Sequence, residues 1–97
     1  MFCGFTPLHA ASARGHLKVV RELLVRGAAV GAATNDGQSP LYVSSWAGHL
    51  EVVRELLTRG ATVGAVVSYG RTALSIAISR GHQTIADLLR AALTTSE

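Results

Sequence analysis

The sequence predicts an all-α fold: a short repeat solenoid in which one helix-turn-helix unit is written three times, with short β-hairpin loops between the units. The main observation is that all ten glycines fall on one lattice with a period of 33 residues. They are Gly4, Gly37 and Gly70; Gly15, Gly48 and Gly81; Gly27 and Gly60; Gly31 and Gly64. Units of this length stack because none can bury its apolar face alone. We expect a single domain over residues 1–97, with repeats at about 1–33, 34–66 and 67–97.

Composition supports a folded intracellular protein. Hydrophobic residues make up 48% of the chain and charged residues 15%, too apolar for a disordered segment. The longest uncharged stretch, residues 37–50, falls short of the ~18 apolar residues that a membrane span needs. The N-terminus has no basic region followed by an apolar core, so no signal peptide is expected. One cysteine, Cys3, cannot form an internal disulfide. These features predict a cytoplasmic or nuclear location without membrane insertion.

The first unit shows how each helix begins and ends. Thr6 is a good N-cap, and Pro7 suits the first helical position because its missing N–H would have no intrahelical partner there. Gly15 ends this helix after about two turns. A second helix opens at His16 and Leu17, carries the apolar stripe Val19, Val20, Leu23 and Leu24, and closes at Gly27. Residues 28–38 then contain Asp-Gly turn chemistry and predict a hairpin-like excursion.

The second and third units repeat the plan. Ser39 and Pro40 open the second unit, Gly48 and His49 form its turn, and Gly60 closes it. In the third unit Thr72 is the cap, and the turn is Gly81-His82. This unit ends without another hairpin. These recurring cap and turn residues therefore predict three helix pairs with the same architecture.

The residues Gly4-Phe-Thr-Pro-Leu-His9-Ala-Ala11, followed by Gly15-His16-Leu17, Leu23-Leu24 and Gly27-Ala28, resemble the ankyrin repeat. The resemblance covers nearly the entire chain. It implies that each repeat is a β-hairpin followed by two antiparallel helices, and that hairpins and first helices form a concave face. It also implies binding rather than catalysis.

The chain departs from the family pattern at several positions. Tyr42 and Ser75 stand where the family usually has His, so the network expected between His9 and Thr6 is altered in later units. Ala73 replaces the usual Pro. Small or uncharged residues replace the Asn and Asp that brace the turns, which predicts looser hairpins; they are Ala29, Gly31, Thr62 and Gly64. The apolar flank of the first unit, including Leu8 and Val20, is expected to lack an N-terminal cap, as in a piece of a longer array.

The histidines do not predict a metal site. His16, His49 and His82 occupy one register, and successive units pack ~8 to 10 Å apart, whereas two nitrogens on one zinc can be only ~4 Å apart. They are interpreted as turn-stabilising residues. No arrangement of Ser, Cys and His supports a nucleophile, so we assign no catalytic residue, no cofactor and no small-molecule substrate.

Charges on the second helices form a ladder. Because equivalent positions are expected to lie side by side, Lys18 should face Glu51, and Arg54 should face Asp87. Such pairs contribute ~0 to 1 kcal/mol each, and we interpret this surface as a solvated outer face in preference to a docking site.

The residues that close the first helices are the more informative set. Trp46 is the only tryptophan, and Arg14 and Arg80 occupy neighbouring registers in the units on either side. Arg71 and Gln38 stand at the hairpin bases. Trp, Tyr and Arg dominate interface hot spots, so these residues form a candidate partner-binding groove. Asn35, Asp36, Ser68 and Tyr69 occupy the hairpin tips. The alternative that Trp46 only packs over the aliphatic parts of neighbouring side chains, without binding a partner, stays open.

The sequence thus predicts a protein–protein interaction module that grips a partner segment, with Trp46 as anchor and the arginines favouring an acidic stretch. One alternative is a structural spacer, a fragment of a longer array that associates with itself or with missing repeats. The other is a weak nucleic-acid binder. It ranks last because the net charge is only +3, no basic cluster occurs and one aromatic lies in the groove.

Overall fold

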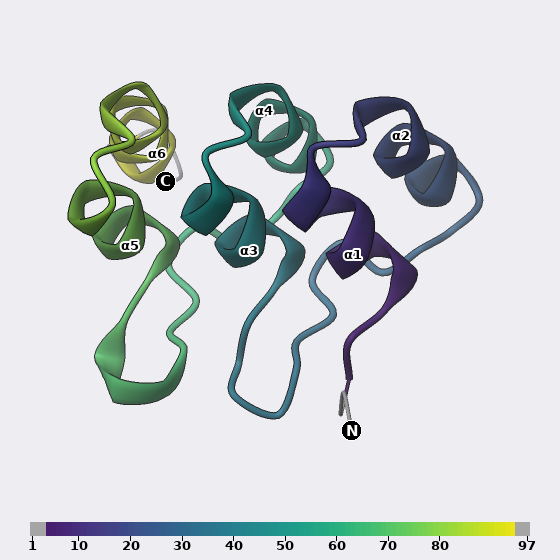
Figure 1. Cartoon of the computed structure of the whole chain (residues 1–97), viewed down its shortest axis with the longest axis horizontal. Coiled ribbons are helices and arrows are strands. Elements are labelled where there is room, and N and C mark those ends of the chain that lie inside the picture. The colour runs from purple at the N-terminus through teal and green to yellow at the C-terminus, as the bar shows by residue number, and fades with distance from the viewer. Residues whose placement is uncertain (1–3, 95–97) are drawn as a thin grey trace.

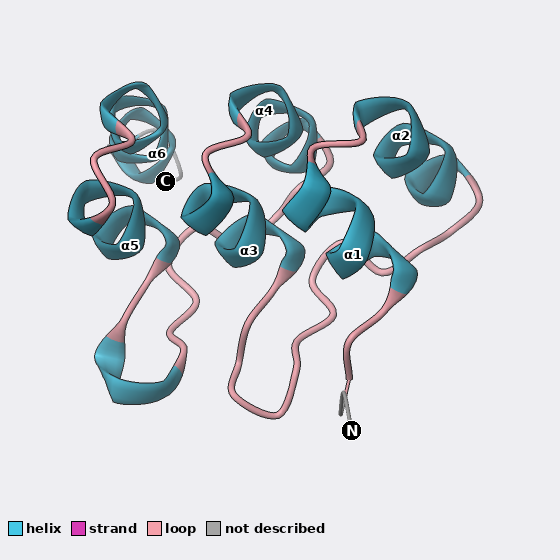
Figure 2. Cartoon of the chain, in the orientation of Figure 1, coloured by secondary structure: helices cyan, strands magenta, loops and turns pink. Residues whose placement is uncertain are grey.

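The computed structural model of the chain describes residues 4–94, so Cys3 lies outside the described residues. Over this range the chain forms helices and loops and no β-strand (Figure 2). The α-helices are α1 (Pro7–Arg14), α2 (Leu17–Val25), α3 (Pro40–Ala47), α4 (Leu50–Thr58), α5 (Ala73–Ser79) and α6 (Gln83–Thr94), and one 3-10 turn is η1 (Ser68–Gly70). The predicted all-α fold is confirmed.

The helices form three pairs that stack side by side (Figure 1). The first helices α1, α3 and α5 contact one another in a row, and the second helices α2, α4 and α6 form a parallel row behind them. Long loops extend from the first-helix side. We call the surface of α1, α3, α5 and the long loops the inner face, and the surface of α2, α4 and α6 the outer face.

The predicted caps begin the first helices. The backbone N–H of His9 donates to Thr6 Oγ1 at 3.3 Å, and that of Tyr42 donates to Ser39 Oγ at 3.1 Å. Thr72 and Ser75 form a reciprocal capping box at the start of α5. Each cap satisfies a backbone donor that the first turn would otherwise leave unpaired. The start of each first helix is therefore set locally.

The long loops fold back as hairpins without a regular strand ladder. The base of each is closed by a backbone hydrogen bond, from Thr34 N–H to Gln38 O at 3.0 Å and from Val67 N–H to Arg71 O at 2.8 Å. The two loops are joined where Ser68 N–H donates to Asp36 O at 3.0 Å. Each loop thus holds its neighbour at the inner face.

The Gly-His turns lock one helix pair to the next. His49 Nε2 donates to the carbonyl of Ala13 in the preceding pair at 3.0 Å, and a Cβ at Gly15 would lie only 2.6 Å from His49 Nδ1. Gly15 also ends α1 with φ 74°, a conformation that favours glycine. His82 Nε2 repeats the bond to Trp46 O at 3.1 Å. These histidines stabilise turns, as predicted, but the turn each one stabilises belongs to the preceding pair.

The core runs through the middle of the stack and is made of leucine, valine, isoleucine and alanine from all three pairs. The expectation that Leu8 and Val20 lie on an uncovered flank is wrong, because both are fully buried. Both side chains belong to the core that the three pairs share. The half-exposed residue on the flank of the first pair is Val19.

The predicted charge ladder of the outer face is wrong in its pairing. The cross-pair bridge joins Arg21 Nε to Glu55 Oε1 at 3.1 Å, whereas Arg54 pairs within its own helix with Glu51 and Asp87 pairs with Arg90. Equivalent positions point in the same direction around parallel helices, so they cannot face each other. A bridge between pairs needs one residue directed forward and another directed backward.

Candidate interaction surface

A pocket of about 360 Å³ opens on the inner face between the first two helix pairs and the loop bases. The residues that line it are Ala13, Gln38, Tyr42, Val43, Trp46 and Arg71. They come from the end of α1, from three positions of α3 and from the base of each long loop. The pocket therefore exists only because two pairs and two loops are stacked.

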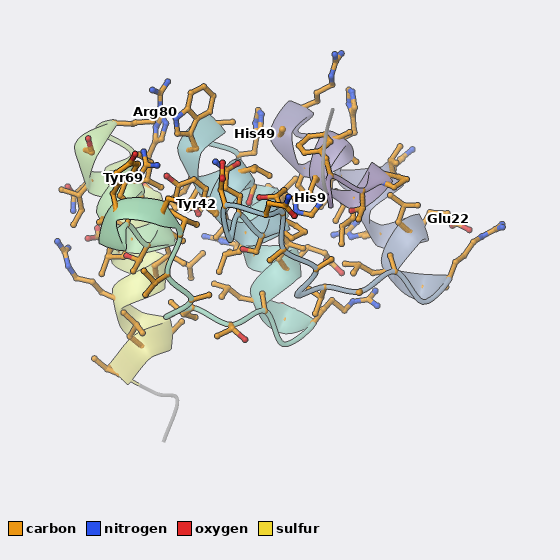
Figure 3. All side chains as sticks on the ribbon, turned by 90° about the horizontal axis from the view of Figure 1, so that it is seen from below. His9, Glu22, Tyr42, His49, Tyr69 and Arg80 are labelled. Atoms are coloured by element: carbon orange, nitrogen blue, oxygen red, sulfur yellow. The ribbon has the colours of Figure 1, made fainter. Side chains whose placement is uncertain are left out.

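The floor of the pocket belongs to a second, smaller apolar cluster. Tyr42, Val43, Val67 and Ile76 are buried together, with Ala13 packed against them. Seen from the loop side, Tyr69, Tyr42 and His9 follow one another across the stack (Figure 3). The sequence interpretation did not include Tyr42 or Val43 among the site residues. Its one signal was that an aromatic ring replaces the usual His at position 42.

Trp46 stands at the last turn of α3 with 47% of its surface exposed. The Arg80 guanidinium carbon lies 4.0 Å from the centroid of the Trp46 ring, and Arg80 Nε donates to Trp46 O at 2.8 Å. The carbonyl of Trp46 therefore accepts from both Arg80 and His82. A cation over an indole face is attracted by the ring's quadrupole. The two side chains form one ordered unit across the boundary between the second and third pairs.

Arg71 and Tyr69 form a second cation–aromatic pair beside the pocket. Arg71 Nε donates to Ser68 O at 3.2 Å, and its guanidinium carbon lies 5.8 Å from the Tyr69 ring centroid. Tyr69 is almost fully exposed and has φ 67°, which is rare for a bulky side chain. The backbone of the second loop thus presents this ring to solvent.

The structure brings together part of the predicted site. Gln38, Trp46 and Arg71 line one pocket, and Arg80 joins them through Trp46. Arg14 is exposed at the end of α1 and does not line the pocket. Asn35 and Asp36 are exposed at the tip of the first loop, also away from the pocket wall. The predicted set therefore divides into a pocket group and a peripheral group.

Ion pairs are distributed unevenly between the two faces. The arginines that pair with a carboxylate within 4.0 Å all lie on or directly after the second helices: Arg21, Arg26, Arg54, Arg59 and Arg90. Over residues 4–94 the inner-face arginines have no carboxylate partner; they are Arg14, Arg71 and Arg80. The arginines that are not engaged by a carboxylate therefore lie on the inner face, although Lys18 on α2 also has no carboxylate within 4.0 Å among the described residues.

Glu55 is the acidic centre of the outer face. It accepts hydrogen bonds from Arg21 Nε at 3.1 Å and from Arg59 Nε at 3.0 Å. The bond from Arg21, opposed by partial burial and assisted by Arg59, holds the pKa of Glu55 below its ordinary value of 4.5. This perturbed carboxylate has a structural explanation.

The described residues provide neither a metal site nor a membrane-spanning helix. Within the described part of the chain, no group of three or more His, Cys, Asp or Glu side chains is placed to hold a metal ion. Among residues 4–94, none of the helices combines the length and apolar character needed to cross a membrane.

Stacked helix pairs with a shared core and a lateral pocket define a repeat protein of the solenoid class. A family model described as ankyrin repeats (3 copies) matches residues 2–67, more than half of the chain. The chain belongs to the ankyrin-repeat family. Ankyrin repeats are in general protein–protein interaction modules and typically not catalytic. No curated protein sequence matches the chain.

The third helix pair lies beyond the matched residues but packs in the same way. α5 contacts α3, and α6 contacts α4, as α3 and α4 contact the first pair. His82 also repeats the bond that His49 makes. The third pair thus continues the stack.

Proposed function

We propose that the chain binds a linear segment of a partner protein on its inner face, with Trp46 as the anchor. The observation that carries the proposal is a half-exposed tryptophan at the rim of a 360 Å³ pocket, held in place by Arg80. Aromatic and arginine side chains that are already ordered lose little entropy on binding and dominate hot spots. The pocket would accept an apolar side chain of the partner beside the indole.

The inner-face arginines would select for acidic residues in that segment. Arg71 and Arg80 each use Nε to bind a backbone carbonyl, and their terminal nitrogens form no hydrogen bond among the described residues. A guanidinium with two free terminal N–H edges can bind a carboxylate through paired hydrogen bonds. We assign a peripheral role to Arg14 and to the loop-tip residues Asn35, Asp36 and Tyr69.

The remaining features of the proposal concern context. We infer that residues 1–97 act as one binding unit of three repeats, at about 1–33, 34–66 and 67–97. Because ankyrin repeats are commonly intracellular, the proposed partner is a cytoplasmic or nuclear protein. We rank nucleic acid last, since among the described residues the inner-face cations are only three arginines.

The test uses selection from a library of random linear peptides displayed on phage, with the whole chain as bait. We expect enriched peptides to carry acidic residues, and Trp46→Ala to weaken their binding by about thirtyfold, the effect of a hot spot. Arg80→Glu should weaken acidic peptides most. The matched control is Val25→Ala, which alters an exposed side chain on α2. Peptides that bind Trp46→Ala and Arg80→Glu as tightly as the wild type would overturn the assignment of the inner face.

A further inference from the structure

The two flanks of the stack expose positions that are buried between the pairs. Val19 has 49% of its surface exposed, whereas its equivalents one and two repeats later, Val52 and Ile85, have 1% and 3%. This position faces the preceding pair. Figure 1 shows that, within the described residues, no helix lies beside the outer side of α1 and α2 or of α5 and α6. We call these sides the leading flank and the trailing flank.

The trailing flank exposes an apolar side chain at a position where the two interfaces inside the stack bury a serine. Ser12 and Ser45 are fully buried between pairs, and their hydroxyl oxygens have no hydrogen-bond partner. The equivalent residue of α5 is Ile78, which has 48% of its surface exposed. Leu74, one helical turn earlier on the same face, is only half-buried, although its equivalents are fully buried. The position that faces water is thus isoleucine, and the positions that face protein are serine.

Hydrogen-bonding groups on the two flanks are also complementary. Inside the stack a histidine of one pair donates to the carbonyl of residue 13 or 46 in the preceding pair. The equivalent histidine of the leading flank, His16, is exposed. The equivalent carbonyl on the trailing flank belongs to Ser79, and a Cβ at the nearby Gly81 would meet no atom within 4 Å. Each flank therefore carries one half of an interface that the molecule already forms twice.

We propose that copies of this chain stack head to tail, with the trailing flank of one copy covering the leading flank of the next. Ile78 and Leu74 of one copy and Val19 of the next become buried at this contact, and His16 Nε2 donates to the carbonyl of Ser79. The contact would continue the two interfaces inside the stack, which share the histidine-to-carbonyl bond and the burial of Val52 and Ile85 against the preceding pair. Since the two surfaces are different, the association is heterologous and open-ended.

Charges make this contact weaker than the internal ones. The position equivalent to Arg21 is Asp87, and the position equivalent to Glu55 is Glu22, so two carboxylates approach each other at the contact. Each carboxylate already has a cation on its own helix, Arg90 for Asp87 and Arg26 for Glu22. Salt screens the remaining repulsion between exposed groups. Added salt should therefore strengthen the association, whereas it would weaken a contact held by opposite charges.

The test is sedimentation equilibrium of the whole chain between about 10 µM and 1 mM, the range in which weak contacts become populated. The expected result is an average mass that rises with concentration and rises further with salt. Ile78→Asp and Val19→Asp should each weaken association at least tenfold. Val25→Asp is the matched control, because Val25 and its equivalents Thr58 and Ala91 are all exposed; it should behave as the wild type.

Mixing the variants tests the direction of stacking. The Ile78→Asp chain keeps an intact leading flank, and the Val19→Asp chain keeps an intact trailing flank. Their equimolar mixture should form a dimer that grows no further, although each variant alone stays monomeric. A wild type that remains monomeric throughout the range overturns the proposal, and so does dimerisation of Val19→Asp by itself, which would mean that trailing flanks pair with each other. These residues lie outside the pocket, so the outcome is independent of peptide binding.

Discussion

All three helix pairs share one apolar core, but on the inner side of that core the first interface contains a buried polar network and the second contains an apolar cluster. At the first interface His9 is fully buried; its Nδ1 accepts from Thr6 N–H at 3.1 Å, and its Nε2 donates to Gln38 O at 2.9 Å. Because a backbone N–H can only donate, the imidazole carries its hydrogen on Nε2. At the second interface the equivalent residue, Tyr42, is buried with Val43, Val67 and Ile76.

The same position of the repeat is thus occupied by a hydrogen-bonded histidine at one interface and by a packed tyrosine at the other. The two residues have different effects on the neighbouring inner face. A buried imidazole must have partners for both nitrogens, so His9 ties the cap of α1 to the base of the first loop. Tyr42 makes no such tie, and it lines the pocket together with Val43 of the same apolar cluster. Besides the histidine bond that both boundaries share, the second boundary has the hydrogen bond from Arg80 to the carbonyl of Trp46. The candidate pocket, which opens between the first two pairs, thus borders the apolar cluster through Tyr42 and Val43.

The largest expected effect comes from breaking the polar interface. His9→Ala leaves Gln38 O and the Thr6 N–H without their partner and opens a cavity, so it should lower the free energy of unfolding by about 3 kcal/mol. Tyr42→Phe is the matched change at the apolar interface and should cost less than about 0.5 kcal/mol, because the ring's packing is retained. Urea denaturation followed by circular dichroism measures both. Equal costs would show that the two interfaces do not differ in kind.

A second experiment sharpens the comparison by testing the device that both interfaces share. Gly15→Ala places a methyl group against the His49 imidazole and forces a left-handed conformation on alanine, so it should cost about 2 kcal/mol. Gly81→Ala has a similar φ of 79° but meets no neighbour and should cost about 1 kcal/mol. Thermal or urea unfolding of the two variants isolates the His49 contact as their difference. Identical losses would mean that the turn conformation alone matters.

The smallest expected effect concerns the outer face of the first interface. The pKa of Glu55 is lower in the folded chain than in the unfolded chain, so its ion pairs stabilise the fold above about pH 4.5 and this contribution is lost as the pH falls through the lower folded pKa. Glu55→Gln should cost about 0.5 to 1 kcal/mol at pH 7 and progressively less toward pH 3.

The measurement is urea unfolding at both pH values, and the control is Glu51→Gln. Glu51 approaches Arg54 only to 4.0 Å within one exposed helix, so this variant should cost less at pH 7. A cost of Glu55→Gln that is unchanged between pH 7 and pH 3 would contradict the assignment.

Much of the fold could be predicted because its signals are local. Thr6 caps the start of the first helix and Gly15 caps its end, and each acts on the adjacent helical turn. The observed α1 lies between these two residues. The same cap and turn residues recur every 33 residues, so the helices of the later units could be predicted from those of the first.

The candidate site could be predicted only in part. Trp46 and Arg71, predicted from their registers, line the candidate pocket, whereas Tyr42 and Val43 line it without having been predicted, because their exposure to the pocket depends on packing between the pairs.

The amino-acid order by itself determined the helix ends, the turns and the apolar stripes, since caps, glycines and helical periodicity act over a few residues. Only the tertiary structure decided which side of each helix faces the next pair. Leu8 and Val20 therefore point into the stack, Arg21 pairs with Glu55, and Trp46 lies under Arg80 at the rim of a pocket. The physical reason is that facing depends on the rotation and offset of neighbouring helices, which are set by packing across the whole interface.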